Sequence, residues 1–301
     1  GVDVGGTHLK IGLVDREGTM LDFQKDDTSP FRDHTDGFGK CFIDLIEKYL
    51  QKYPQVEKVG IGLPGMISKD RSTPLEIPAI PDLNNFNLKA GLEKKYPNHE
   101  FFLENDAAAA AIGEFYYGKG EVAENFLFIT MGTGIGSALI LEGQVFKGSR
   151  GNAMEMGHML SRGNAGLETL IGRKGILKIM DNLISAYPEK AKELVGKELG
   201  THLLVDTAKD GNEVSLMVFK EVADILSEAI VSTIRILDVT DVYFGGGISA
   251  GLEFMMPTIE YNTRKYLTPY YVRDLKLRIA TLENNAGTLG AAALCFMGSG
   301  L

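Results

Sequence analysis

Three short glycine-rich segments could bring the backbone close to an anion. They are Gly5-Gly6-Thr7, Gly132-Thr133-Gly134 and Gly245-Gly246-Gly247, and each follows a short apolar run typical of a strand. Because glycine has no Cβ, backbone N–H groups in such turns can approach a phosphate without obstruction. One such segment alone is most often a plain turn, so the prediction of a nucleotide site depends on the three together.

Two common nucleotide-binding fingerprints do not fit the chain. No segment matches GxxxxGK[ST], which excludes a Walker-type site. Gly132-x-Gly134-x-Gly136 superficially suggests a dinucleotide fingerprint, but a strand rather than a helix follows it and the third glycine is missing at the required spacing. The glycine turns therefore need a different structural context.

A carboxylate that could accept a proton lies where a strand is expected to meet a helix. Phe101-Phe102-Leu103 is typical of a strand, and residues 105–117, which begin Asn105-Asp106 and continue through five alanines, predict a helix. Asp106 is then exposed at the end of the strand, where the helix N-terminus favours its ionised form. The alternative is that Asn105 or Asp106 serves only as the helix N-cap.

A glutamate and a histidine are spaced to face one direction further along the chain. Glu155 and His158 form an i, i+3 pair, and Glu168 follows. Carboxylate and imidazole groups can both hydrogen-bond the hydroxyl groups of a ligand. The alternative for His158 is an ordinary surface or core histidine.

The chain contains an internal echo that would position these residues. Val2–Val4, a glycine turn, Leu9–Val14, the turn at residues 15–18 and a third short strand form the first copy. Phe126–Thr130, a glycine turn, Ala138–Leu141, the turn at residues 142–143 and residues 144–146 form the second. A duplicated domain core is the simplest interpretation, because the spacing is far longer than a solenoid repeat.

Amphipathic segments predict the helices that follow these hairpins. Residues 38–50 and 219–237 carry apolar side chains at helical spacing, and the second leads into the short strand Val242-Tyr243-Phe244. A helix of small residues is expected over about 287–296. The chain has no low-complexity linker, so we expect two closely packed domains with the ligand site in a cleft between them.

Composition narrows the class of protein. The chain has 301 residues, 44% of them hydrophobic, and a formal net charge of −9, which argues against nucleic acid as a partner. No run approaches the roughly 18 apolar residues that span a bilayer, so no membrane association is expected. Cys41 and Cys295 lie far apart in sequence, which favours a reducing, cytoplasmic location over a disulfide framework.

Taken together, the glycine segments resemble the nucleotide-contacting segments of the actin-like ATPases. The resemblance implies an α/β, ribonuclease H-like fold with duplicated βββαβα cores, ATP as the nucleotide, and Mg²⁺ held through water by Asp3. It places a small N-terminal domain at residues 1–106, completed by a C-terminal helix at about 287–301, and a large domain at 107–286. The implied nucleotide contacts are Asp3, Gly5, Gly6, Thr7, Lys10, Gly132, Thr133, Gly134, Gly246 and Gly247.

Five motifs narrow the resemblance to the ROK family (repressors, open reading frames and kinases) over essentially the whole chain. They are Asp3-Val4-Gly5-Gly6-Thr7, Gly62-Leu63-Pro64-Gly65, Glu104-Asn105-Asp106-Ala107, Met131-Gly132-Thr133-Gly134-Ile135-Gly136 and Glu155-Met156-Gly157-His158. In this family Asp106 corresponds to the catalytic base that accepts the proton of a sugar hydroxyl. The implied sugar contacts are Gly65, Asn105, Asp106, Glu155, His158 and Glu168, with Asn84 as a looser addition.

One departure from the family pattern concerns zinc. Many members carry a CxCGxxGC motif shortly after the histidine, whereas residues 159–168 of this chain contain no cysteine. Without thiolate ligands a structural zinc is not expected, and local packing must hold the loop instead.

The resemblance implies an ATP-dependent hexose kinase, with phosphorylation of glucose to glucose 6-phosphate as the default. N-acetylmannosamine, N-acetylglucosamine, fructose or allose remain alternative substrates, and polyphosphate an alternative donor. A sugar-responsive transcriptional regulator and an ATP-driven conformational machine are alternatives of different classes. Members are often dimers, so the resemblance also suggests a homodimer.

Overall fold

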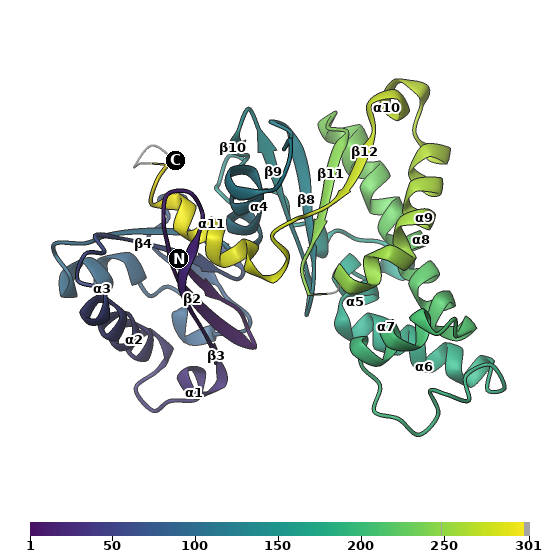
Figure 1. Ribbon diagram of the computed structural model, residues 1–301, viewed down its shortest axis with the longest axis horizontal. Helices are drawn as coiled ribbons and strands as arrows, with labels where there is room; N and C mark the ends of the chain where they lie inside the picture. Colours follow the sequence, from purple (N-terminus) through teal and green to yellow (C-terminus); the bar gives the residue numbers. More distant parts are fainter. Residues whose placement is uncertain (248, 298–301) are drawn as a thin grey trace. The chain divides into compact units, whose positions relative to one another are not determined.

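The computed structural model describes residues 1–247 and 249–297 (Figure 1). The chain forms two compact units. Unit 1 comprises Gly1–Glu124, Ala138–Met154 and the C-terminal segment from Asn284, and unit 2 comprises Asn125–Ser137 and Glu155–Glu283. The residues singled out in the sequence are distributed over both units.

The first five-stranded sheet lies in unit 1 and has the order β3-β2-β1-β4-β7. Its strands are β1 (Val2–Val4), β2 (His8–Val14), β3 (Met20–Asp27), β4 (Lys58–Leu63) and β7 (Glu100–Asn105). β1, β2 and β3 pair antiparallel through tight turns, whereas β1, β4 and β7 are parallel. The carboxyl ends of β1, β4 and β7 therefore meet at one edge of the sheet, where Asn105 ends β7.

Apart from residues 138–154, which contribute strands to the second sheet, the remaining elements of unit 1 are mostly helices. They are α1 (Ser29–Arg32), α2 (Phe38–Lys52), α3 (Leu88–Lys95), α4 (Asp106–Tyr117), α11 (Ala286–Leu294), the small hairpin β5 (Met66–Ile67) and β6 (Pro74–Glu76), and the 3₁₀ turn η1 (Pro81–Leu83). The predicted helices at 38–50 and 105–117 are confirmed. α2 buries Phe38, Phe42 and Ile46, as its apolar spacing requires.

The second sheet repeats the strand order of the first. Its strands are β8 (Phe126–Met131), β9 (Ile135–Leu141), β10 (Gln144–Val145), β11 (Asp241–Gly245) and β12 (Lys276–Ile279), in the order β10-β9-β8-β11-β12. β9 and β10 pair antiparallel, and β8, β11 and β12 are parallel. If the five strands of each sheet are numbered along the chain, both sheets have the spatial order third, second, first, fourth, fifth. This shared order confirms the duplicated core.

Helices of unit 2 fill most of the chain between β10 and β12. They are α5 (Leu167–Ile171), α6 (Arg173–Ala186), α7 (Thr201–Lys209), α8 (Glu213–Leu237), α9 (Ser249–Tyr266) and α10 (Pro269–Asp274), together with the 3₁₀ turns η2 (Met156–His158), η3 (Arg162–Asn164) and, at the unit boundary, η4 (Glu283–Asn285). α8 and α9 lie side by side (Figure 1). α8 begins before the predicted residue 219 because Asn212 caps it by accepting from the Ser215 N–H.

Two sequence expectations differ in detail from the structure. The expected boundary after residue 106 would separate α4 from unit 1, but α4 packs closely on α11 and residues 107–124 belong to unit 1. The C-terminal helix ends at Leu294, and residues 298–301 of its expected span lie outside the described residues.

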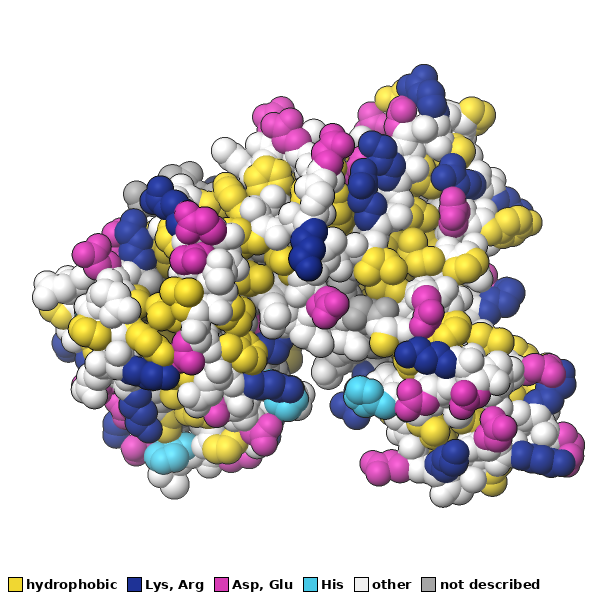
Figure 2. Space-filling view, in the orientation of Figure 1, with side chains coloured by type: hydrophobic (Ala, Val, Ile, Leu, Met, Phe, Trp, Pro, Cys, Tyr) yellow, Lys and Arg dark blue, Asp and Glu magenta, His cyan; other side chains and the backbone are white. Residues whose placement is uncertain are grey.

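The described part of the chain contains no helix that is long and apolar enough to cross a membrane. Acidic and basic side chains are interspersed over the face drawn in Figure 2. Both cysteines are free thiols.

Candidate active site

The first glycine turn joins β1 and β2 in unit 1. Gly5 N–H donates to the His8 carbonyl at 2.9 Å, and the buried Thr28 hydroxyl donates to the Gly5 carbonyl at 2.7 Å. Within the described residues, the backbone N–H groups of Gly6 and Thr7 have no hydrogen-bond partner. The turn is thus held from outside while two adjacent donors remain available for an anion.

Asp3 and Lys10 form an ion pair beside this turn. Lys10 Nζ lies 3.0 Å from Asp3 Oδ2 and donates to the Asn284 carbonyl at 3.0 Å, so two acceptors hold the lysine ammonium group in place. A carboxylate next to two free N–H donors fits a phosphate accompanied by Mg²⁺, because this cation prefers oxygen ligands. The Asp3–Lys10 pair joins β1 and β2, the two strands that the Gly5–Thr7 turn connects, and nucleotide binding by these residues stays a prediction.

At the junction of β7 and α4, Asn105 and Asp106 have different roles. Asn105 is the N-cap of α4: its Oδ1 accepts from Ala108 N–H at 3.0 Å, and its Nδ2 donates to the Gly65 carbonyl at 3.1 Å. Asp106 is the first helical residue, half-buried, with Oδ1 accepting from Ala107 N–H at 2.8 Å. The helix cap is thus assigned to Asn105, and its bond to the Gly65 carbonyl brings together two of the residues that the resemblance named as sugar contacts.

A buried ion cluster under this junction was not identified from the sequence. The Glu104 side chain is 2% exposed and receives Arg71 at 3.0 Å and Lys147 at 3.3 Å. Glu104 Oε1 also accepts from Asn105 N–H at 2.9 Å, which connects the cluster to the cap. A glutamate inside an apolar strand is a signal that it is paired, but its partners lie far away in sequence.

The second glycine turn joins β8 and β9 in unit 2. Gly132 N–H donates to the Gly134 carbonyl at 2.9 Å, which closes the turn. In the part of the chain that the structure describes, the N–H groups of Thr133 and Gly134 have no partner. Gly245 at the end of β11 pairs in register with Thr130, so Gly246 and Gly247 follow a strand that ends beside the same turn.

Glu155, His158 and Glu168 are brought together in unit 2. His158 Nε2 lies 3.9 Å from Glu155 Oε2, and the His158 side chain is exposed. Burial raises the pKa of Glu155 above its usual value; His158 opposes this shift and the negative charge of Glu168 adds to it. Two carboxylates and an imidazole that converge in this way can bind several hydroxyl groups of one sugar.

The loop after His158 is held without cysteine. Leu167 N–H donates to the Met159 carbonyl at 2.9 Å and Ser161 N–H to the Ala165 carbonyl at 2.8 Å, so residues 159–167 close on themselves. Arg162 then pairs with Glu228 on α8. Backbone bonds and one ion pair thus hold the segment where many family members carry a zinc motif.

Asn84 has a structural contact of its own. Asn84 Oδ1 accepts from the Ile77 N–H at 2.8 Å, which holds the turn after β6.

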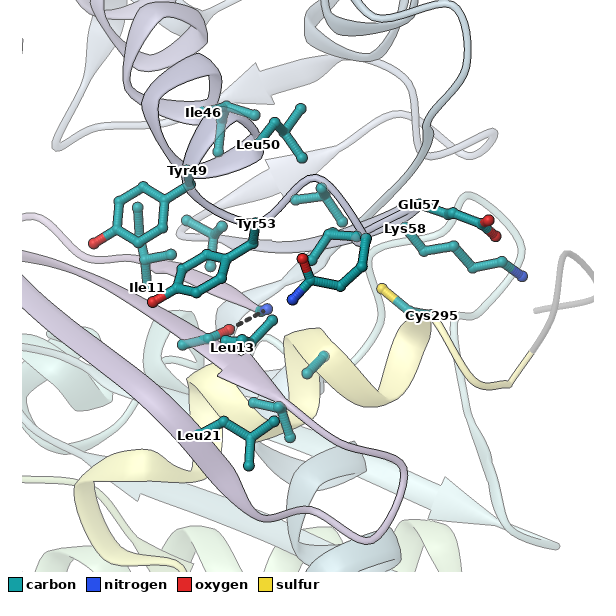
Figure 3. A pocket seen from close by; sticks show the side chains of 18 of the residues that line it. Ile11, Leu13, Leu21, Ile46, Tyr49, Leu50, Tyr53, Glu57, Lys58 and Cys295 are labelled. Atoms are coloured by element: carbon teal, nitrogen blue, oxygen red, sulfur yellow. Dashed lines mark hydrogen bonds between the residues drawn. The ribbon is translucent and has the colours of Figure 1, made fainter.

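A separate cavity of about 430 Å³ lies in unit 1, between β2, α2, β4 and α11 (Figure 3). Leu13, Leu21, Leu50 and Cys295 lie around it, together with Tyr49 and Tyr53 from α2 (Figure 3). None of the predicted site residues lines it. Its mostly apolar wall is poorly suited to a polyhydroxylated substrate.

Comparison with known proteins shows similarity over nearly the whole chain. A glucokinase of Thermotoga maritima is 30% identical over 98% of this chain and 96% of its own length. A xylose repressor of Caldicellulosiruptor bescii is 27% identical over 98% of this chain and 77% of its own length. The crystal structure of a ROK family glucokinase from Streptomyces griseus, solved with glucose and AMPPNP, matches with a TM-score of 0.83 at 28% identity and covers 99% of both chains.

These matches confirm the predicted actin-like ATPase fold. The family model described as "ROK family" matches residues 1–297. The chain belongs to the ROK family.

Proposed function

We propose that the protein is an ATP-dependent hexose kinase that transfers the γ-phosphoryl group of Mg·ATP to a sugar hydroxyl, with glucose as the leading substrate. One observation carries the proposal: unit 2 combines a hydroxyl-binding cluster with a turn whose N–H groups are available to phosphate. The Glu168 carboxylate belongs to the cluster and accepts from Ile135 N–H at the end of that turn at 2.9 Å. A protein that binds only a sugar has no use for the second feature.

Asp106 is proposed as the general base. The oxygen of the sugar hydroxyl forms a bond to the γ-phosphorus, the bond from that phosphorus to the bridging oxygen of ADP breaks, and the hydroxyl proton passes to Asp106. In a loose transition state the proton leaves late, so the carboxylate mainly positions the hydroxyl until transfer is well advanced. Asn105 is held by Gly65 and Ala108, which fixes the backbone from which Asp106 projects.

The remaining residues bind and orient. The carboxylates of Glu155 and Glu168 accept hydrogen bonds from the other sugar hydroxyls, and the His158 imidazole can accept from or donate to them. These bonds orient the sugar and so position the hydroxyl that reacts. The free N–H groups of Gly6, Thr7, Thr133 and Gly134 stabilise charge on the phosphates. When bound, Mg²⁺ neutralises phosphate charge, and Asp3 is the residue suited to hold it through water.

The similarity to glucokinases of two bacteria favours glucose among the hexoses. N-acetylmannosamine, N-acetylglucosamine and fructose also carry a primary hydroxyl group that could accept the phosphoryl group, and they stay as alternative substrates. The similarity to a xylose repressor keeps a sugar-responsive regulator as the alternative from a different class. Free N–H donors in both glycine turns favour the kinase, because a regulator that does not use ATP has no need of N–H groups that bind phosphate.

A coupled ADP-release assay with Mg·ATP tests the proposal. The panel is glucose, mannose, fructose, allose, N-acetylglucosamine and N-acetylmannosamine. We expect one sugar, glucose first, to show a kcat/KM far above the others. A sugar that raises the Tm without any ADP release would support the regulator instead. If no sugar of the panel causes ADP release or raises the Tm, the hexose assignment is contradicted.

A further inference from the structure

We propose that Glu168 has a second role as a positioning residue for the phosphate-binding turn, so that one carboxylate couples the sugar site to the nucleotide site. This inference deepens the proposed function and rests on it, because it assumes that the turn at Gly132–Gly134 binds nucleotide phosphate. It differs from a purely sugar-binding Glu168 in predicting an effect on nucleotide affinity when no sugar is present.

The first observation is the way in which the turn is held. Within the described residues the turn's own bond joins only Gly132 N–H to the Gly134 carbonyl. The Glu168 carboxylate holds the next residue, with Oε2 accepting from Ile135 N–H at 2.9 Å. Arg173 N–H at the start of α6 donates to the Thr133 carbonyl at 3.2 Å. Residues from the α5–α6 segment thus fix the turn at two points, the Thr133 carbonyl between its two free N–H groups and the Ile135 N–H that follows them.

The second observation is steric. A Cβ placed on Gly134 would lie 2.1 Å from Glu168 Oε2, so the carboxylate occupies the space that any larger residue would need. A Cβ on Gly157, between Glu155 and His158, would lie 2.3 Å from the Ile135 carbonyl. The elements that carry the hydroxyl-binding residues are therefore packed directly onto the backbone of the turn.

The third observation is that Glu168 lies beside the residues of the proposed hydroxyl-binding cluster. Leu167 N–H donates to the Met159 carbonyl at 2.9 Å, and α5 packs against η2, the turn that ends with His158. The negative charge of Glu168 also raises the pKa of Glu155, in agreement with this placement. A carboxylate can accept about four hydrogen bonds, and Ile135 N–H uses only one position on Oε2. A sugar hydroxyl that donates to one of the remaining positions would stabilise the Glu168 side chain in the conformation that accepts from Ile135 N–H.

The consequence is a link between the two ligands. A sugar that orders Glu168 also orders Ile135 and the adjoining N–H donors, which then bind phosphate at lower entropic cost. By thermodynamic reciprocity the nucleotide must raise the sugar affinity by the same factor.

The test measures the Kd of AMPPNP with Mg²⁺ by isothermal titration calorimetry in the absence of sugar. Glu168→Ala removes the acceptor. Glu168→Asp keeps the charge but is one methylene too short to reach Ile135 N–H, and it serves if the alanine variant does not fold. For both we expect a Kd about tenfold higher than wild type, because phosphate must then order a turn that Glu168 no longer holds.

Two further variants separate positioning from sugar binding. Glu168→Gln retains an amide oxygen for Ile135 N–H, so its AMPPNP Kd should stay within about twofold of wild type. His158→Ala is the matched control: it removes a proposed sugar contact that makes no side-chain bond to the turn, so it should raise the sugar KM and leave the AMPPNP Kd unchanged.

An unchanged AMPPNP Kd in the alanine and aspartate variants, with a raised sugar KM, would overturn the coupling and leave the kinase proposal intact. A weakened Kd in His158→Ala as large as that in Glu168→Ala would also overturn it, since the effect would then be general. A wild-type protein that binds no AMPPNP would contradict the proposed function itself, and the inference with it.

Discussion

At the scale of single residues, burial shifts the pKa of Glu155, one of the proposed sugar contacts. The side chain is 35% exposed, and its burial raises the pKa above the usual glutamate value. The folded state therefore binds the proton more tightly than the unfolded state, and ionised Glu155 destabilises the fold at neutral pH. That cost disappears as the pH falls through the raised pKa.

We expect Glu155→Gln to raise the Tm slightly, by about 1 °C at pH 7, because it removes a partly buried charge that remains screened by solvent. The difference from wild type should shrink as the pH is lowered through the acidic range, where the wild-type carboxyl becomes protonated. Thermal scans of both proteins between neutral and acidic pH measure it. A wild type that is clearly more stable than the variant at pH 7 would contradict the sign of the shift.

Arg71 and Glu104 form a second residue-scale feature with a larger expected effect. Their side chains are 12% and 2% exposed, so Arg71→Ala leaves a buried carboxylate with Lys147 as its remaining charged partner. We expect a loss of about 2–4 kcal/mol in the free energy of unfolding, measured by urea denaturation.

Lys58→Ala is the matched control for Arg71→Ala. It breaks the exposed pair with Glu100 on the strands β4 and β7 of the same sheet, and should cost less than about 1 kcal/mol. Equal effects of the two variants would show that burial of the Glu104 cluster does not matter.

At the scale of elements, the loop at residues 159–167 keeps its form through backbone hydrogen bonds and the Arg162–Glu228 pair. Since no metal ligand takes part in these contacts, we expect excess EDTA without nucleotide to leave both the Tm and the sugar-induced rise in Tm unchanged within about 1 °C. Differential scanning fluorimetry with and without EDTA checks this. A fall of several degrees, reversed by added zinc, would contradict the metal-free account of the loop.

Several helices and hairpins could be predicted from local signals in the sequence. The hairpins around both glycine turns, α2 and α4 are present close to their expected bounds, because alternation, helical apolar spacing and the Asn105 cap are local signals. α8 extends six residues before its predicted start at residue 219 because the Asn212 cap was not considered. Boundaries that depend on a single capping residue are easily displaced.

At the scale of the whole molecule, the duplicated core could be predicted because both copies repeat one local pattern. The assignment of α4 to unit 1 could not, because it depends on packing against α11 across most of the chain length. The Glu104 cluster and the contact of Glu168 with Ile135 were missed for the same reason: their partners are brought together only by the fold.

The central claim is that Asp106 accepts the proton of a sugar hydroxyl during phosphoryl transfer. The most direct measurement compares wild type and Asp106→Asn in the ADP-release assay, with the sugar Kd of each measured by calorimetry. We predict that the variant loses about three or more orders of magnitude in kcat while its sugar Kd changes by less than about tenfold. A variant that keeps a turnover comparable to wild type would contradict the assignment of the base and the mechanism built on it.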